Sequence, residues 1–249
     1  KCDDMSRERE IANNIDEVQE QIALACARAG RSVDDVKLVA VSKTKPIEDI
    51  LAATKVGIRD FGENRIEEAS EKIPAVNDML DQTVVWHMIG HIQSRKARDV
   101  VPLFASVHSV DSLKIARKLS SLASEEGKTL NVFAEVNVSG EPQKYGFEAS
   151  NWQIDAQQFD MLQQTISQIA QLPGLKLVGL MTMAPFVSDA ERTRPVFASM
   201  AALRSELASK LAISLPHLSM GMTNDYTVAI EEGATMVRVG TAIFGARNT

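Results

Sequence analysis

The fold of this chain is decided by Val36-Lys37-Leu38-Val39-Ala40-Val41-Ser42-Lys43-Thr44-Lys45-Pro46. The first six residues form a largely apolar run, which predicts a strand buried on both faces of a parallel sheet. Thr44 or Lys45 is expected to cap a helix that follows, and Pro46 suits the first turn of that helix. The stretch is therefore one strand–helix unit, with Lys43 at the carboxyl tip of its strand.

The same unit recurs along the chain. Eight apolar runs predict strands, and they lie at residues 36–41, 58–61, 84–89, 106–110, 132–138, 175–180, 216–219 and 236–239. Helical patterns lie between them, near residues 65–73, 94–101, 112–126, 156–172, 190–211 and 225–232. Regular alternation of strands and helices predicts a parallel α/β fold.

Eight such units favour a closed (β/α)8 TIM barrel, which typically needs about 250 residues. The chain has 249 residues and no long linker, so we expect a single domain over residues 1–249. A doubly wound open sheet is the alternative. The dinucleotide-binding form of that sheet is disfavoured, because no Gly-x-Gly-x-x-Gly run follows a predicted strand.

An amphipathic helix is predicted before the barrel. Its apolar residues repeat at spacings of four and three, and they are Ile11, Ile15, Val18, Ile22 and Ala25. Gly30 stands where a C-terminal cap is expected.

The composition narrows the function classes. The formal net charge of −6 argues against a general binder of nucleic acid or of anionic membranes. No run approaches the roughly 20 apolar residues of a membrane-spanning helix, and no signal peptide is recognisable. Cys2 and Cys26 fit no metal or redox spacing. We expect a cytoplasmic protein.

Lys43 is the first candidate for a residue that reacts with a ligand. A protonated lysine is a weak nucleophile, but burial or a neighbouring cation such as Lys45 lowers its pKa and activates the amine. The amine then suits Schiff-base formation with an aldehyde. The alternative is that both lysines are solvated residues at the end of a strand.

Two runs near the end of the chain have the character of a phosphate site. Ser219-Met220-Gly221-Met222-Thr223 follows the seventh predicted strand, and Gly240-Thr241 follows the eighth. Barrels frequently bind phosphate with these two loops, because glycine lets backbone amides approach and hydroxyls add donors. Thr223 and Asn224 are alternatively plain helix caps.

Other polar residues of the sequence have both a functional and a structural interpretation. Arg238 lies inside an apolar strand, where it is either a structural ion pair or a partner for the pyridine nitrogen of pyridoxal 5′-phosphate (PLP). His87 and His91 are four residues apart but not on a predicted helix, so we expect no metal site. We expect His87 to point from a strand tip toward the pocket. The loop at residues 139–146 is either a solvated turn or a rim in which Lys144 meets anions.

These motifs, in this order, resemble the pyridoxal phosphate homeostasis proteins, single-domain relatives of the barrel domain of alanine racemase. The resemblance rests on residues 40–46, 61–64, 86–90, 179–183, 218–222 and 237–245. It implies that Lys43 holds PLP as a Schiff base and that Arg238 faces the ring nitrogen. It also implies that Asn64 lines the site and that the phosphate is held by Ser219, Thr223, Gly240 and Thr241. His91, Arg95 and Thr223 depart from the residues usual in the family.

The expected function is that of a PLP carrier without robust turnover. The racemases use a tyrosine from an added domain, and this chain ends four residues after Gly245, so we expect neither that domain nor a shared dimer site. We therefore expect a monomer, with PLP-dependent apoenzymes as partners. The alternatives are a monomeric PLP-dependent amino-acid racemase and a barrel enzyme in which Lys43 is an aldolase base acting on a phosphorylated sugar.

Overall fold

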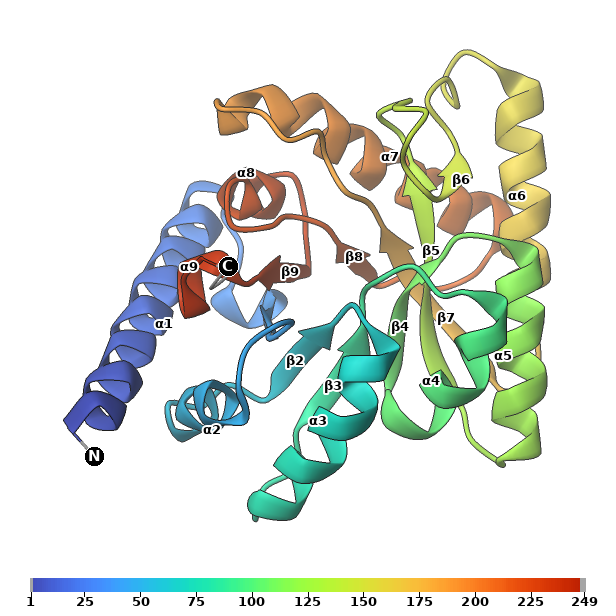
Figure 1. Cartoon of the computed structure of the whole chain (residues 1–249). Coiled ribbons are helices and arrows are strands. Elements are labelled where there is room, and N and C mark those ends of the chain that lie inside the picture. Colours follow the sequence, from blue (N-terminus) through green and yellow to red (C-terminus); the bar gives the residue numbers. More distant parts are fainter. Residues whose placement is uncertain (1, 247–249) are drawn as a thin grey trace.

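Eight parallel strands close into a barrel in the computed structural model, which describes residues 2–246 and the side chains of residues 5–246 (Figure 1). Lys1, residues 247–249 and the side chains of residues 2–4, Cys2 among them, lie outside the described part. The ring consists of β1 (Lys37–Val41), β2 (Asp60–Glu63), β3 (Val85–Met88), β4 (Ser106–Val110), β5 (Leu130–Asn137), β7 (Leu175–Met181), β8 (His217–Ser219) and β9 (Met236–Val239). Pairing of β1 with β9 and of β4 with β5 closes the ring, which confirms the (β/α)8 barrel and excludes the open sheet.

One short strand was not expected. β6 (Phe147–Glu148) pairs with the carboxyl end of β5 outside the ring. Its apolar content is too small for a sequence pattern to reveal it.

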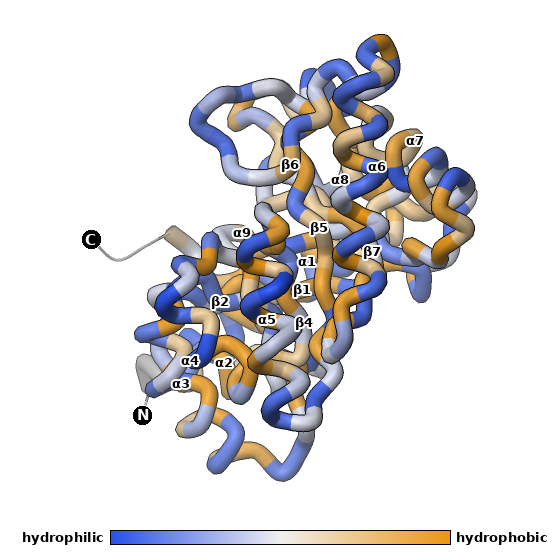
Figure 2. Tube along the Cα trace, turned by 90° about the vertical axis from the view of Figure 1, so that its right-hand side faces the viewer, coloured by the Kyte–Doolittle hydropathy of each residue, from blue (hydrophilic) through white to orange (hydrophobic). Residues whose placement is uncertain are grey.

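Helices surround the barrel, and α1 (Cys2–Arg28) lies across one side of it (Figure 1). The others are α2 (Ile47–Lys55), α3 (Ile66–Met79), α4 (Ala97–Leu103), α5 (Leu113–Glu125), α6 (Ala156–Ala170), α7 (Arg194–Leu211), α8 (Tyr226–Glu231) and α9 (Thr241–Phe244). In Figure 2 the colour is hydrophobic along much of β5 and mostly hydrophilic in the loop beside β6. None of the helices within residues 2–246 has both the length and the apolar character needed to cross a membrane.

The structure confirms the amphipathic helix predicted before the barrel, which is α1. The five apolar residues at spacings of four and three are all buried, and α1 contacts α2, α8 and α9. The helix ends at Arg28, and Gly30 has a φ of 64°, the left-handed conformation of a glycine cap. α1 therefore covers the side of the barrel where the first and last strands meet.

Candidate functional site

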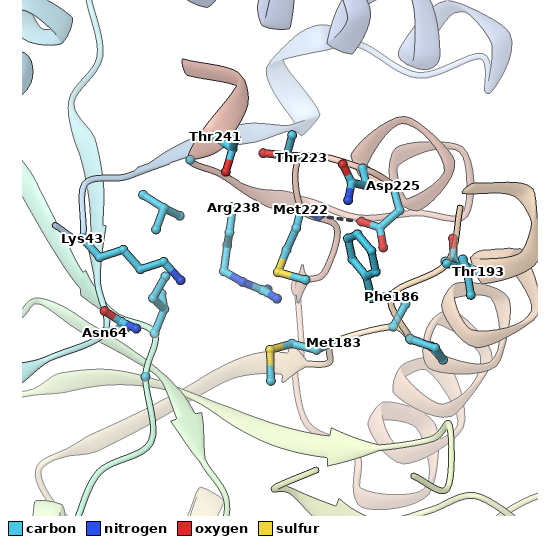
Figure 3. A pocket seen from close by; sticks show the side chains of 18 of the residues that line it. Lys43, Asn64, Met183, Phe186, Thr193, Met222, Thr223, Asp225, Arg238 and Thr241 are labelled. Carbon is cyan, nitrogen blue, oxygen red and sulfur yellow. Dashed lines mark hydrogen bonds between the residues drawn. The ribbon is translucent and has the colours of Figure 1, made fainter. Parts of the chain in front are cut away.

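A cavity of about 610 Å³ opens at the carboxyl ends of the barrel strands (Figure 3). Six of the seven predicted site residues line it, namely Lys43, Asn64, Thr223, Arg238, Gly240 and Thr241. Figure 3 shows the Lys43 side chain extending toward Arg238. The strand tips and the last two loops therefore meet as the sequence predicted.

A buried cluster of polar side chains forms hydrogen bonds to the end of β1, immediately before Lys43. The Ser42 hydroxyl donates to Glu63 Oε1 at 2.7 Å, and Lys72 Nζ donates to the Ser42 carbonyl and to Glu63 Oε1, both at 2.9 Å. Glu63 is fully buried, and burial raises the pKa of its carboxyl while Lys72 opposes the rise. These bonds fix the backbone immediately before Lys43.

The turn after Lys43 is also constrained. Thr44 has a φ of 62°, and its backbone N–H donates to Glu68 Oε1 at 2.6 Å. The Lys45 N–H donates to the Ser42 carbonyl at 3.1 Å, which closes the turn. Pro46 consequently is the N-cap residue of α2, one position before the first turn in which it was expected. The left-handed residue explains this difference, because it delays the start of the helix.

Lys45 links the β1 tip to the last helix. Its Nζ donates to the carbonyls of Phe244, Gly245 and Ala246 at 3.0, 3.0 and 2.8 Å. Burial lowers the pKa of Lys45, and the charge of Arg7 lowers it further. Its ammonium group thus holds α9 beside the cavity in addition to providing positive charge there.

Asn64 presents a polar atom that lacks a partner in the described protein. Its Oδ1 is buried and accepts no hydrogen bond, although such acceptors are nearly always satisfied. Gly90 fixes the Asn64 backbone, because a Cβ atom at Gly90 would lie 2.2 Å from the Asn64 carbonyl oxygen. Asn64 therefore offers an acceptor to a bound ligand.

The two glycine-containing loops lie together, as predicted. Gly221 has a φ of 98°, and Asp225 Oδ1 accepts the Met222 N–H at 2.7 Å in the same turn. The Ala242 N–H donates to Thr223 Oγ1 at 3.4 Å, which connects this loop to α9. Gly240 lies against β1, since a Cβ there would be 3.2 Å from the Val41 carbonyl.

Arg238 reaches the cavity from inside the barrel. Its Nη1 donates to Ser219 Oγ at 2.6 Å and its Nη2 to the Thr182 carbonyl at 3.1 Å. Burial lowers the pKa of Arg238 to about 10, against the opposing charges of Glu135 and Asp225. Ser219 itself is fully buried and is absent from the cavity wall, so the structure places it beneath the cavity, under Arg238.

Sequence reasoning missed a carboxyl group in the cavity wall. Glu135 lies in β5 with 4% of its surface exposed, and burial together with the charge of Asp111 raises its pKa to about 7. The signal was present in the sequence, since Glu135 interrupts the apolar run 132–138. A carboxyl with a pKa near neutrality can take up and release a proton.

The prediction for His87 was wrong. His87 does not reach the cavity. It lies in the barrel interior, with Nδ1 3.0 Å from His108 and Nε2 2.8 Å from Asp60, because the middle of β3 faces inward. His91 lines the cavity instead, where its ring stacks on Tyr145 with centroids 3.9 Å apart.

Lys144 forms an ion pair within its loop and a hydrogen bond to a residue outside it. Lys144 pairs with Glu141 and donates to the Met183 carbonyl at 2.9 Å. Met181 is buried in a small apolar cluster with Phe133, and Met183 packs against that cluster while lining the cavity. Lys144 is therefore tied to the edge of the cavity through Met183.

The comparisons with known proteins identify the family of the chain. Residues 13–248 match the family model described as alanine racemase, N-terminal domain. The alanine racemase of Clostridium difficile shares the fold with a TM-score of 0.71 and 17% identity, over 98% of this chain and 60% of that one. The chain is thus a member of the class of barrels related to the N-terminal domain of alanine racemase.

More similar relatives narrow this class. The pyridoxal phosphate homeostasis protein of Pseudomonas aeruginosa is 44% identical over 238 residues, which cover 96% of each chain. That of Aquifex aeolicus is 38% identical over 233 residues, which cover 94% of this chain and 96% of the relative. PipY of Synechococcus elongatus, solved with PLP bound, has a TM-score of 0.79 and 34% identity, over 94% of this chain and all of that one. The chain belongs to the pyridoxal phosphate homeostasis protein family, which confirms the resemblance seen in the sequence.

Proposed function

We propose that this protein binds PLP as a Schiff base on Lys43 and contributes to PLP homeostasis without robust catalytic turnover. One observation carries the proposal: a single cavity joins a lysine, a pair of hydroxyl- and glycine-containing loops, and a buried arginine. These groups match the three polar parts of PLP that a protein can recognise, which are the aldehyde, the phosphate and the ring nitrogen. The PLP-bound structure of the relative PipY supports the same choice of ligand.

Each polar group of PLP can be assigned to residues that line or support the cavity. Lys43 would hold the aldehyde carbon, and the Thr223 and Thr241 hydroxyls with the backbone at Gly240 would hold the phosphate. The unpartnered Asn64 Oδ1 would accept a hydrogen bond in the loaded protein. Ser219, the remaining predicted phosphate ligand, would act through Arg238.

Arg238 supports a carrier in preference to an enzyme. When bound, PLP supplies an electron sink, and the strength of that sink depends on the group facing its ring nitrogen. An arginine retains its protons and donates to an unprotonated nitrogen, so the sink stays weak. Release of PLP to PLP-dependent apoenzymes in the cytoplasm then fits this site better than repeated proton abstraction.

The second candidate is an amino-acid racemase. It is favoured by Glu135, whose carboxyl lines the cavity with a pKa of about 7 and so meets the requirement for a general base. Incubation of the loaded protein with amino acids in heavy water tests it. Exchange of the α-proton at ordinary turnover rates, lost in Lys43→Ala, would overturn the carrier function.

Borohydride reduction followed by mass spectrometry tests the cofactor and the lysine together. The protein is loaded with PLP, reduced and digested, and the expected result is a pyridoxyl group on Lys43. Lys210→Ala, which removes a lysine from the surface of α7, should retain the adduct, and Lys43→Ala should lose it. An unmodified Lys43 in PLP-treated protein contradicts the proposal and favours the sugar-phosphate barrel enzyme.

A further inference from the structure

A continuous line of hydrogen bonds crosses the interior of the barrel and ends at Arg238. Asp60 Oδ1 lies 2.8 Å from His87 Nε2, and His87 Nδ1 lies 3.0 Å from His108 Nε2. His108 Nδ1 lies 2.7 Å from Ser219 Oγ, which accepts from Arg238 Nη1 at 2.6 Å. The five residues come from β2, β3, β4, β8 and β9, and we refer to them as the interior relay.

The relay joins the two ends of the barrel. Asp60 is the first residue of β2, at the end opposite the cavity, where Lys37 Nζ lies 3.3 Å from its carboxylate. The Lys37 side chain is 47% exposed, so water reaches this end. His87, His108 and Ser219 are 2% exposed or less. A buried hydrogen-bond chain of this kind is strong, and every break in it is costly.

The bonding pattern determines where the protons lie. Burial by itself would raise the pKa of Asp60, but the hydrogen bond from His87 and the charge of Lys37 lower it overall, so Asp60 is a carboxylate and His87 Nε2 must donate. With the His87 proton on Nε2, Nδ1 is the acceptor in the bond to His108 Nε2. Burial holds the pKa of His108 well below its usual value, so this ring is neutral and its Nδ1 accepts the Ser219 proton. The Ser219 oxygen is left to accept from Arg238.

We propose that four positioning residues hold the Arg238 guanidinium against the cofactor, namely Asp60, His87, His108 and Ser219. Through their hydrogen bonds, the charge of Asp60 determines how strongly Ser219 binds Arg238. This inference rests on the proposed binding of PLP. No member of the relay other than Arg238 lines the cavity, so the effect passes through hydrogen bonds and not through contact with the ligand.

The relay has a second proton arrangement. If His87 Nε2 loses its carboxylate acceptor, the His87 proton can move to Nδ1 and be donated to His108 Nε2, and His108 Nδ1 then donates to Ser219. Ser219 then receives protons from both sides, and its bond to Arg238 weakens. The charged and titratable groups around the two rings are Lys37 and Asp60 beside His87, and Arg238 and His217 beside His108.

Asp60→Asn tests the relay from the end remote from the cofactor. The amide can donate to His87 Nε2 and so permits the second arrangement. We expect the visible absorbance of bound PLP to shift and PLP release to accelerate about five-fold or more, the size of a moderate coupling between sites. Asp34→Asn removes the same charge from an exposed position before β1 and should change neither property.

A double-mutant cycle shows whether Ser219 carries the effect. In a Ser219→Ala background the relay is broken, so Asp60→Asn should have no further effect on absorbance or release. An equal effect in both backgrounds would refute the relay, and so would a protein that binds PLP normally and ignores Asp60→Asn.

The proton positions can be measured without cofactor. In unloaded protein labelled with nitrogen-15 in histidine, His108 should show the neutral form protonated at Nε2, and His87 should carry a proton on Nε2 and none on Nδ1, as the hydrogen-bond geometry requires. A His108 ring protonated at Nδ1 would overturn the inference. If the wild-type protein fails to bind PLP at all, the proposed function fails, and this measurement still decides the relay.

Discussion

Replacing Lys72 with Met should destabilise the protein by about 3–5 kcal/mol, the usual cost of removing one partner of a buried ion pair. Lys72 is 7% exposed, and its ammonium lies 2.9 Å from the fully buried Glu63 carboxylate. Glu63 Oε2 has no hydrogen-bond partner among the described residues, so the remaining carboxylate would be left with little besides the Ser42 hydroxyl. Against a typical total stability of about 5–15 kcal/mol, this loss is large.

The loss should depend on pH with a definite sign. Burial raises the pKa of Glu63, and Lys72 limits that rise, so the pKa of Glu63 is higher still in Lys72→Met. A carboxyl that holds its proton more tightly when folded destabilises the fold as pH rises above its unfolded pKa of about 4.3. The variant should therefore lose most stability at pH 8 and least near pH 5.

Urea denaturation followed by circular dichroism at pH 5 and pH 8 provides the measurement. Adding Glu63→Gln to Lys72→Met removes the buried charge and should recover much of the stability at pH 8. Lys210→Met breaks an exposed pair with Glu206, with side chains 57% and 45% exposed, and should cost about 1 kcal/mol or less. A Lys72→Met variant that is as stable as the wild type at pH 8, or equally destabilised at both pH values, would refute the reasoning.

Three further variants test other parts of the structure. Glu135→Gln should be more stable than the wild type at pH 8 by up to about 3 kcal/mol. The reason is that burial raises the pKa of the Glu135 carboxyl from 4.5 to about 7, and each pKa unit corresponds to about 1.4 kcal/mol. The difference should vanish at pH 4.5 in urea denaturation. Gly90→Ala should weaken PLP binding in a fluorescence titration, since the added Cβ would lie 2.2 Å from the Asn64 oxygen. Arg7→Met should lower stability by about 1.5–3 kcal/mol in thermal melting, because it removes two hydrogen bonds, of 2.7 and 3.1 Å, to the buried Asp49.

Much of the fold was predictable because its units are local. Each ring strand overlaps an apolar run of the sequence. The number of units and the chain length favoured the closed barrel, and the pairing of β1 with β9 and of β4 with β5 decided against the open sheet. The sequence pattern places the start of α2 one position too early, because the left-handed conformation of Thr44 depends on Glu68 from another helix. β6 was missed because its two residues form a strand only by pairing with β5.

The candidate site was predictable for those residues that lie at the carboxyl ends of the strands. Lys43, Asn64 and the loops after β8 and β9 must share one end of a parallel barrel, whatever its details. Ser219 and His87 could not be placed in this way. Whether an inward-facing strand residue reaches the cavity or stays beneath it depends on the stagger of neighbouring strands.

The sequence by itself determined the alternation of strands and helices and the set of reactive groups at the strand tips, because periodicity and turn residues act over short distances. Only the tertiary structure decided how those groups are tuned. The pKa of Glu135 near 7 and the relay from Asp60 to Arg238 arise from burial and from partners up to 111 residues apart in the chain. Burial and hydrogen-bond distance are properties of the closed barrel, and no local pattern encodes them.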